Sequence, residues 1–175
     1  MLLLATWAVA AAMALGGGTK PVIAPITSAS VLDAPTRHVR TTDRALQGLL
    51  RSGYTHSPTF AALMARLERS DVYVYLEAVP RLPGALEGRL LIQPQAHGVR
   101  YVRIQIALRG EPKDAIALIG HELHHAVEVA DAPEVFDSAD LAALYRRIGI
   151  DRGNNEFDTL DAQEAGRRVR RELIA

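Results

Sequence analysis

The sequence of 175 residues contains no cysteine. This absence excludes a disulfide framework, a cysteine nucleophile and a cysteine-ligated metal. Basic and acidic side chains balance at 20 each, lysine is scarce, and no cluster of one sign stands out. Proteins that bind nucleic acid usually carry a basic face, so we expect no nucleic-acid partner.

Long apolar runs are also absent, apart from one at the start of the sequence. Met1 to Leu15 is apolar except for Thr6. A run of about 14 apolar residues is short for a membrane-spanning helix and suits the hydrophobic region of a secretory signal. Ala12-Met13-Ala14 offers a small-x-small cleavage pattern, although a charged region before the apolar run is missing. We expect an exported protein, periplasmic or extracellular, with residues 1–15 as a signal peptide or membrane anchor. A buried apolar segment of a cytosolic protein is the third possibility.

The remaining sequence divides into a tether and one domain. Residues 16–40 are rich in Gly, Pro, Ser and Thr, a composition typical of an extended linker. Residues 41–175 are numerous enough to bury a core of their own. The sequence shows no internal repeat, and it does not indicate an oligomeric state.

Hydrophobic periodicity predicts the fold class. Apolar residues at helical spacing, as in Phe60, Leu63, Met64 and Leu67, predict helices. The expected helices cover 42–51, 59–69, 111–130, 138–148 and 156–173. Period-two alternation predicts strands at 71–77, 88–95 and 99–108, with a hairpin turn between the last two. We therefore expect an α+β domain, a short antiparallel sheet packed with about five helices.

The helix expected over 111–130 contains the motif that carries chemistry. His121-Glu122-Leu123-His124-His125 fits the pattern H-E-x-x-H. His121 and His125 are four residues apart, so their imidazoles lie on one helix face within reach of one ion. Glu122 is rotated by about a quarter turn, beside the site and not in its centre. Two neutral imidazoles and a nearby carboxylate are what a hydrolytic zinc site needs, because the carboxylate can take a proton from a metal-activated water.

A simpler interpretation of the motif is a polar stripe on a solvated helix face. The apolar residues of this helix lie opposite His121 and His125, as they would on any amphipathic helix. The preceding run from Ala115 to Gly120 is apolar all round, however, which indicates a buried helix. A buried histidine pair needs a partner, so the context favours zinc. His124 points away from the ligand face.

Catalytic zinc usually has three protein ligands, so a third ligand is expected. The candidates are Glu128, Asp158, Asp161 and Glu164. On the helix expected over 156–173, Asp158 falls on the apolar face, Asp161 at its edge and Glu164 among arginines on the far side. We prefer Asp158, although a carboxylate that only interacts with the helix dipole is the alternative. Glu128 is expected to orient a ligand imidazole or to pair with an arginine.

With these residues in place, the sequence resembles the zincin metallopeptidases, which are named for H-E-x-x-H. The order of a motif helix followed by a separate helix with a carboxylate is similar to the gluzincin arrangement, in a minimal version. Phe157-Asp158-Thr159 and Ala162 look like the gluzincin ligand helix, with Asp158 where that pattern has glutamate. The third histidine of metzincins is absent, since Asp131 stands at its position.

The resemblance implies a zinc-dependent peptidase that acts on a peptide or protein substrate. His121, His125 and Asp158 would hold the zinc, and Glu122 would be the general base. The strand at 99–108 would be an edge strand that pairs with extended substrate. The alternative is a non-catalytic zincin-like domain of the cell envelope that binds a protein partner.

Zincins also stabilise the oxyanion of the reaction with a side chain that faces the metal. Four residues are candidates for this role: Tyr145, His97, Tyr101 and Arg103. The sequence does not choose among them. Tyr145 lies at helical spacing with Leu141 and Leu144, which favours core packing.

Overall fold

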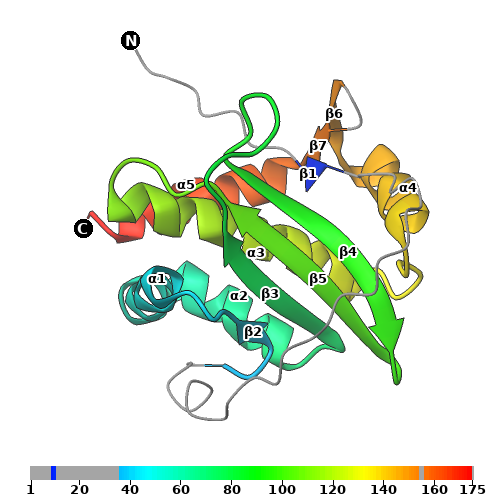
Figure 1. Cartoon of the computed structure of the whole chain (residues 1–175), viewed down its shortest axis with the longest axis horizontal. Helices are drawn as coiled ribbons and strands as arrows, with labels where there is room; N and C mark the ends of the chain where they lie inside the picture. The colour runs from blue at the N-terminus through cyan, green and yellow to red at the C-terminus, as the bar shows by residue number, and fades with distance from the viewer. Residues whose placement is uncertain (1–8, 11–35, 154–155, 175) are drawn as a thin grey trace.

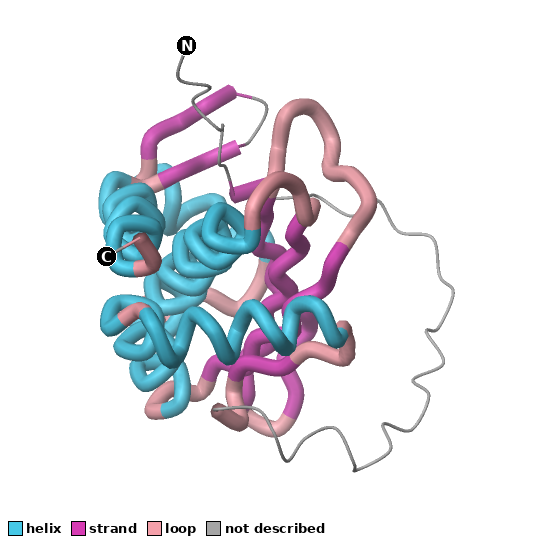
Figure 2. Tube along the Cα trace, turned by 90° about the vertical axis from the view of Figure 1, so that its left-hand side faces the viewer, coloured by secondary structure: helices cyan, strands magenta, loops and turns pink. Residues whose placement is uncertain are grey.

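A computed structural model describes residues 9–10, 36–153 and 156–174. A four-stranded sheet forms one layer, and helices cover one of its faces (Figures 1 and 2). The α+β class with five helices is therefore confirmed for the described residues. The expected signal region and tether lie outside them, except for Val9–Ala10 and residues 36–40. Among the helices that are described, none has the length and apolarity to span a membrane.

The helices lie close to their predicted positions. They are α1 (Arg44–His56), α2 (Pro58–Glu68), α3 (Pro112–Asp131), α4 (Ser138–Ile148) and α5 (Leu160–Glu172). Side-chain oxygens cap several of their N-termini, because the first helical N–H groups have no partner within the helix. Asp43 caps α1, Ser57 caps α2, Asp137 caps α4 and Thr159 caps α5.

The main sheet is mixed, so the prediction of an antiparallel sheet was wrong. Its strands are β2 (Val39–Arg40), β3 (Val72–Ala78), β4 (Gly88–Ala96) and β5 (Val99–Ile106), in the order β2-β3-β5-β4. The β4–β5 hairpin is antiparallel, but β3 pairs with β5 in parallel. After β3 the chain forms β4 at the edge of the sheet, and it then returns as β5, which lies between β3 and β4. Periodicity shows which residues of a strand face the core, but not which strands are neighbours.

The small second sheet was not predicted. It contains β1 (Val9–Ala10), β7 (Glu156–Asp158) and β6 (Ile150–Gly153), in the order β1-β7-β6. The last helix was expected from about Glu156, but it begins at Leu160 after the Thr159 cap. Asp158 is therefore the last residue of a strand, and not part of the first turn of a helix.

The folded part also begins earlier than expected. Val39, at the end of the range assigned to the tether, is fully buried and pairs with Val74 of β3. Residues 36–40 therefore belong to the sheet and its approach.

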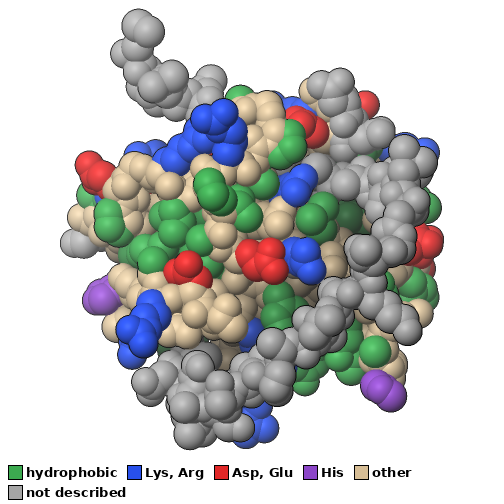
Figure 3. Space-filling view, viewed as in Figure 1, with side chains coloured by type: hydrophobic (Ala, Val, Ile, Leu, Met, Phe, Trp, Pro, Cys, Tyr) green, Lys and Arg blue, Asp and Glu red, His purple; other side chains and the backbone are tan. Residues whose placement is uncertain are grey.

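Helix α3 occupies the middle of the domain. It contacts the sheet as well as α1, α2 and α5. Close packing with α5 depends on Gly120, because a Cβ there would lie 2.9 Å from Val169 Cγ2. The side of β5 that carries Val102 and Ile104 is buried against the helices, as the alternation predicted. The face turned to the viewer in Figure 3 intersperses basic and acidic side chains with apolar ones. The packing of α3 against the sheet and α5 places the H-E-x-x-H turn between β4, β7 and α5.

Candidate metal centre

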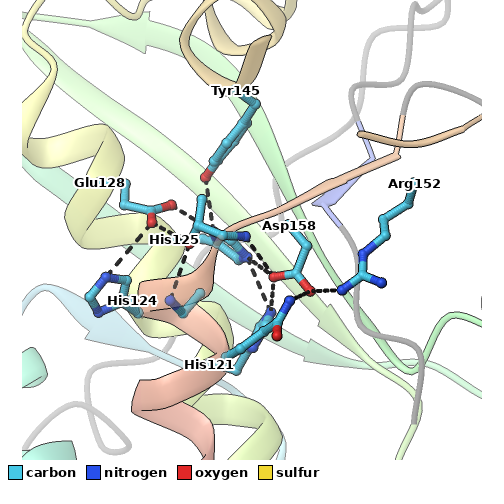
Figure 4. Close-up of polar contacts among 10 residues, drawn as sticks. His121, His124, His125, Glu128, Tyr145, Arg152 and Asp158 are labelled. Atoms are coloured by element: carbon cyan, nitrogen blue, oxygen red, sulfur yellow. Dashed lines mark hydrogen bonds and ion pairs between the residues drawn. The ribbon is translucent and has the colours of Figure 1, made fainter. Parts of the chain in front are cut away.

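Three side chains from two different elements converge on one point. His121 and His125 come from α3, and Asp158 comes from the end of β7 (Figure 4). The two histidine Nε2 atoms are 3.1 Å apart, and Asp158 Oδ1 lies 3.4 Å and 3.7 Å from them. All three residues are at most 1% exposed. The histidine face of α3 is therefore not a solvated polar stripe.

The three donor atoms are spaced as a small tetrahedral ion requires. Bonds of about 2.0–2.1 Å at tetrahedral angles would separate two ligand atoms by roughly 3.3 Å. The observed separations of 3.1 to 3.7 Å lie around that value. Two imidazoles and one carboxylate also form a donor set that zinc accepts. The described part of the chain offers no other group of three such residues.

The other candidates for the third ligand lie elsewhere or act differently. Glu164 forms ion pairs with Arg167 and Arg171 on the outer side of α5. Asp161 is exposed. Asp158 is therefore the carboxylate that the fold brings to the histidines, although it reaches them from a strand.

Glu128 fixes the orientation of His125, which is one of the two roles that the sequence left open for it. Its Oε2 lies 2.7 Å from His125 Nδ1, and its Oε1 accepts a hydrogen bond of 2.6 Å from the Thr159 hydroxyl. Tyr145 is fully buried, and its hydroxyl lies 3.2 Å from the same His125 nitrogen. Because Glu128 and Tyr145 lie at Nδ1 of His125, its Nε2 is directed towards His121 and Asp158.

Asp158 is fixed just as firmly, by residues that the sequence did not single out. Its Oδ1 accepts a hydrogen bond of 2.7 Å from the Thr159 N–H. Its Oδ2 accepts from Gln163 at 2.9 Å and from Arg152 at 3.2 Å. Oδ2 is thus occupied, while Oδ1 faces the histidines. Neither Arg152 nor Gln163 carries a local sequence pattern, since their roles depend on how β6, β7 and α5 meet.

The two histidines have opposite charge preferences. Burial and the nearby His125 hold the pKa of His121 well below its usual value. Burial also lowers the pKa of His125, but its hydrogen bonds to the carboxylates of Asp158 and Glu128 outweigh this effect and raise the pKa to about 9. Around neutral pH the metal-free pair therefore carries one positive charge, on His125, whose Nε2 lies 3.1 Å from Nε2 of the neutral His121.

Glu122 is the most unusual carboxyl group of the site. It is fully buried, and neither of its oxygens has a hydrogen-bond partner among the residues that the structure describes. Burial raises its pKa to about 8, against the opposing charge of His125. A buried carboxylate without a partner is costly. A pKa near neutrality also suits a group that must accept and return a proton.

Glu122 can occupy this place only because β4 begins with a glycine. A Cβ on Gly88 would lie 2.5 Å from Glu122 Oε1. We expect Gly88→Ala to lower the free energy of unfolding by about 1–3 kcal/mol, the usual cost of overpacking. In a Glu122→Ala background the same change should cost less than half as much. Denaturant unfolding of the four chains measures the difference.

The matched control for this cycle is Gly48→Ala in α1, where no atom lies within 4 Å of the added methyl group. We expect it to be neutral or slightly stabilising, since alanine favours helix more than glycine. If Gly88→Ala lowers the free energy of unfolding equally with and without Glu122, the added methyl group does not clash with this side chain.

Three of the four oxyanion candidates do not reach the site. Tyr101 lies on the outer face of the sheet beside Tyr73, and Arg103 forms an ion pair with Glu77 there. His97 lies in the exposed turn of the β4–β5 hairpin. Tyr145 is at the site, but it backs His125 from within the core. Arg152 reaches the site from another direction, with an ion pair of 3.2 Å to Asp158 Oδ2 (Figure 4).

The expected substrate-binding edge strand was also misplaced. β5 pairs with β3 on one side and β4 on the other, so its backbone is not free for a peptide. β4 is the edge strand of the main sheet, and it begins at Gly88 next to Glu122. The period-two pattern is as strong in a central strand as in an edge strand, and this caused the error.

Comparison with known proteins adds no relative. No protein-family model, no curated protein and no solved structure matches the chain.

Proposed function

We propose that the chain is a zinc-dependent peptidase, with a minimal zincin-like arrangement of its site. The main support for this proposal is the convergence of His121, His125 and Asp158 beside the buried carboxyl group of Glu122, which has no hydrogen-bond partner among the described residues. A purely structural metal site needs the three donors. It does not need a further carboxyl group that is buried without a partner at the same place.

Each residue has a role in the proposed hydrolysis. A zinc ion at the three donors would supply a Lewis acid and lower the pKa of a water. Glu122 would take the proton of that water and pass it to the leaving amine. Glu128 keeps His125 in its ligating orientation. Arg152 donates a hydrogen bond to Oδ2 of Asp158, so that Oδ1 remains directed at the two histidines.

The edge of β4 supports a peptide as the substrate. Edge strands offer free backbone groups that an extended peptide can pair with. β4 starts at Gly88, which touches Glu122, so a peptide along this edge would pass the proposed base. The proposed site would thus combine a backbone-binding strand with a proton acceptor.

A binding domain is the second candidate, and one surface feature favours it. A groove of about 650 Å³ lies between α2, α3 and α5, with an apolar floor that includes Leu63 and Val127. Arg66 and Arg168 line it as well. A partner helix could lie in such a groove, and the metal would then be structural.

Metal content tests the proposal directly. We expect the purified chain to hold about one zinc, because the three donors define one site. Asp158→Ala should lower the zinc content clearly, since it leaves two protein ligands. Glu164→Ala, on the outer side of α5, is the matched control and should retain zinc. Elemental analysis after dialysis measures this. Zinc loss in the Glu164 variant with retention in the Asp158 variant would contradict the assigned site.

The affinity for zinc should depend on pH. His125 must release its proton to ligate, and its pKa of about 9 lies above the value of about 6.5 for a free histidine. Protonation of His125 therefore stabilises the metal-free fold below about pH 6.5, and this contribution is lost as pH rises through 9. Zinc binding should strengthen up to about tenfold per pH unit between 7 and 9. Competition with a chelator at pH 7 and 8 measures it. A flat profile would show that no proton is displaced.

A further inference from the structure

Two strands that flank the metal centre belong to different sheets. β4 is the edge of the main sheet, and β7 leads directly into Asp158. β1 lies between them, where it pairs antiparallel with β7 and contacts β4 (Figure 1). A segment from the start of the sequence thus fills the space between two strands on either side of the site.

The register places β1 very close to the metal donors. Val9 pairs with Phe157, the residue before Asp158, and Ala10 pairs with Glu156. In Figure 4 the faint blue ribbon of β1 passes beside Asp158 and Arg152. The three donors and Glu122 are at most 1% exposed. β1 therefore lies next to the strand that carries Asp158 into a buried site.

The pairing shows what kind of ligand the space accepts. β7 has three residues, and its ladder with β6 is irregular between Asp151 and Gly153. A strand so short gains from a second partner on its free edge, because unpaired backbone groups otherwise need water. The two paired residues, Val9 and Ala10, are apolar and uncharged, and neither is a proline. An extended, uncharged peptide held by its backbone meets these conditions.

We propose that the space between β4 and β7 is a binding slot for an extended apolar peptide, and that its occupant is this chain's own strand Val9–Ala10. Backbone pairing with β7 holds this strand beside the metal centre. Displacing it frees the edge of β7 for another peptide. The slot goes beyond the proposed hydrolysis, because it requires neither metal nor activity.

A cysteine pair tests the occupancy of the slot in the full chain. The natural sequence has no cysteine, so introduced thiols have no competitors. Paired Cα atoms in an antiparallel ladder are about 4.5–5.5 Å apart, which suits a disulfide. Ala10→Cys with Glu156→Cys should therefore form an intramolecular disulfide in dilute solution. Intact mass shows the loss of two hydrogens, and it verifies that residues 1–15 are present.

The matched control is Ala10→Cys with Asp151→Cys. Asp151 pairs with Phe157 from the opposite side of β7, so it lies two strand spacings, about 9–10 Å, from β1. This exceeds the limit of roughly 7 Å for a disulfide. We expect the first pair to oxidise at least about tenfold faster than the second. Similar rates in the two variants, or slow oxidation of both, would overturn the proposal.

A peptide added in trans tests the ligand class. The probe is a synthetic peptide with residues 7–12, Trp-Ala-Val-Ala-Ala-Ala, flanked by lysines for solubility. A tethered segment has an effective concentration of order millimolar, so about 5 mM peptide should slow the oxidation of the first pair about twofold. The same peptide with two prolines in place of Val9 and Ala10 lacks the N–H donors and should not slow it. No slowing by the first peptide, or equal slowing by both, would refute a backbone-binding slot. A chain without zinc would refute the proposed function and leave these results standing.

Discussion

Glu122→Gln should reduce peptide hydrolysis by about two to four orders of magnitude, the usual contribution of a positioned general base. The substitution keeps the size of the side chain and removes the oxygen that accepts the proton. Glu122 is adjacent in sequence to His121, but it is not among the three converging donors. Zinc content should therefore remain near that of the wild type. Cleavage of an unstructured peptide library, with zinc measured on the same samples, tests both expectations.

The control for this experiment is Glu164→Gln on the outer side of α5, where only arginines are its partners. It should retain both zinc and activity. A zinc-loaded wild type that cleaves no peptide, or a Glu122→Gln variant that cleaves as well as the wild type, would favour the binding-domain alternative. Loss of zinc in the Glu122 variant would instead show that this carboxylate takes part in holding the metal.

The helices were predictable because their signals are local. The apolar stripe Phe60, Leu63, Met64 and Leu67 is buried in α2, as its spacing indicated. Pro112 lies at the start of α3, where its missing N–H costs nothing. The i, i+4 spacing of His121 and His125 brought their Nε2 atoms together, which follows from helix geometry alone.

Asp158 was selected by an argument that the structure supports only in part. The helix-wheel comparison separated Asp158 from Glu164 correctly, since one is buried with the histidines and the other is paired with arginines. Asp158 nevertheless lies in β7, before the helix begins. Its inward direction comes from the strand and from the Thr159 N–H that holds Oδ1. The Thr159 cap that begins α5 is a local signal that was available in the sequence.

The remaining parts of the site depend on long-range pairing, which no local pattern encodes. The insertion of β5 between β3 and β4 decides that Gly88, and not a residue of β5, lies against Glu122. Arg152 reaches Asp158 only because β6 and β7 pair. Both contacts follow from tertiary arrangement, so a single sequence does not reveal them.

Arg100 connects the main sheet to the end of the motif helix. It lies on the helix-facing side of β5 and is 4% exposed. Its guanidinium donates two hydrogen bonds of 2.7 Å to Asp71, and it donates to the carbonyls of Val129 and Ala132 at 2.8 and 2.7 Å. These carbonyls lie at the C-terminus of α3, where a positive charge also offsets the helix dipole. The arginine lowers the pKa of Asp71 through the same hydrogen bonds.

Arg100→Met should therefore lower the free energy of unfolding by about 1–3 kcal/mol, because it leaves the carbonyls of Val129 and Ala132 without this donor. Asp71 adds little to the loss, since its side chain is 46% exposed and water can solvate it. Arg100→Lys should recover only a small part, because an ammonium group cannot reproduce the two-pronged contact with Asp71. The matched control is Arg103→Met on the opposite face of the same strand. The side chains of Arg103 and Glu77 are 41% and 42% exposed. Removal of this exposed ion pair should therefore cost less than about 1 kcal/mol. Urea unfolding of the metal-free chains measures all three. Equal losses at Arg100 and Arg103 would show that the end of α3 does not depend on this buried charge.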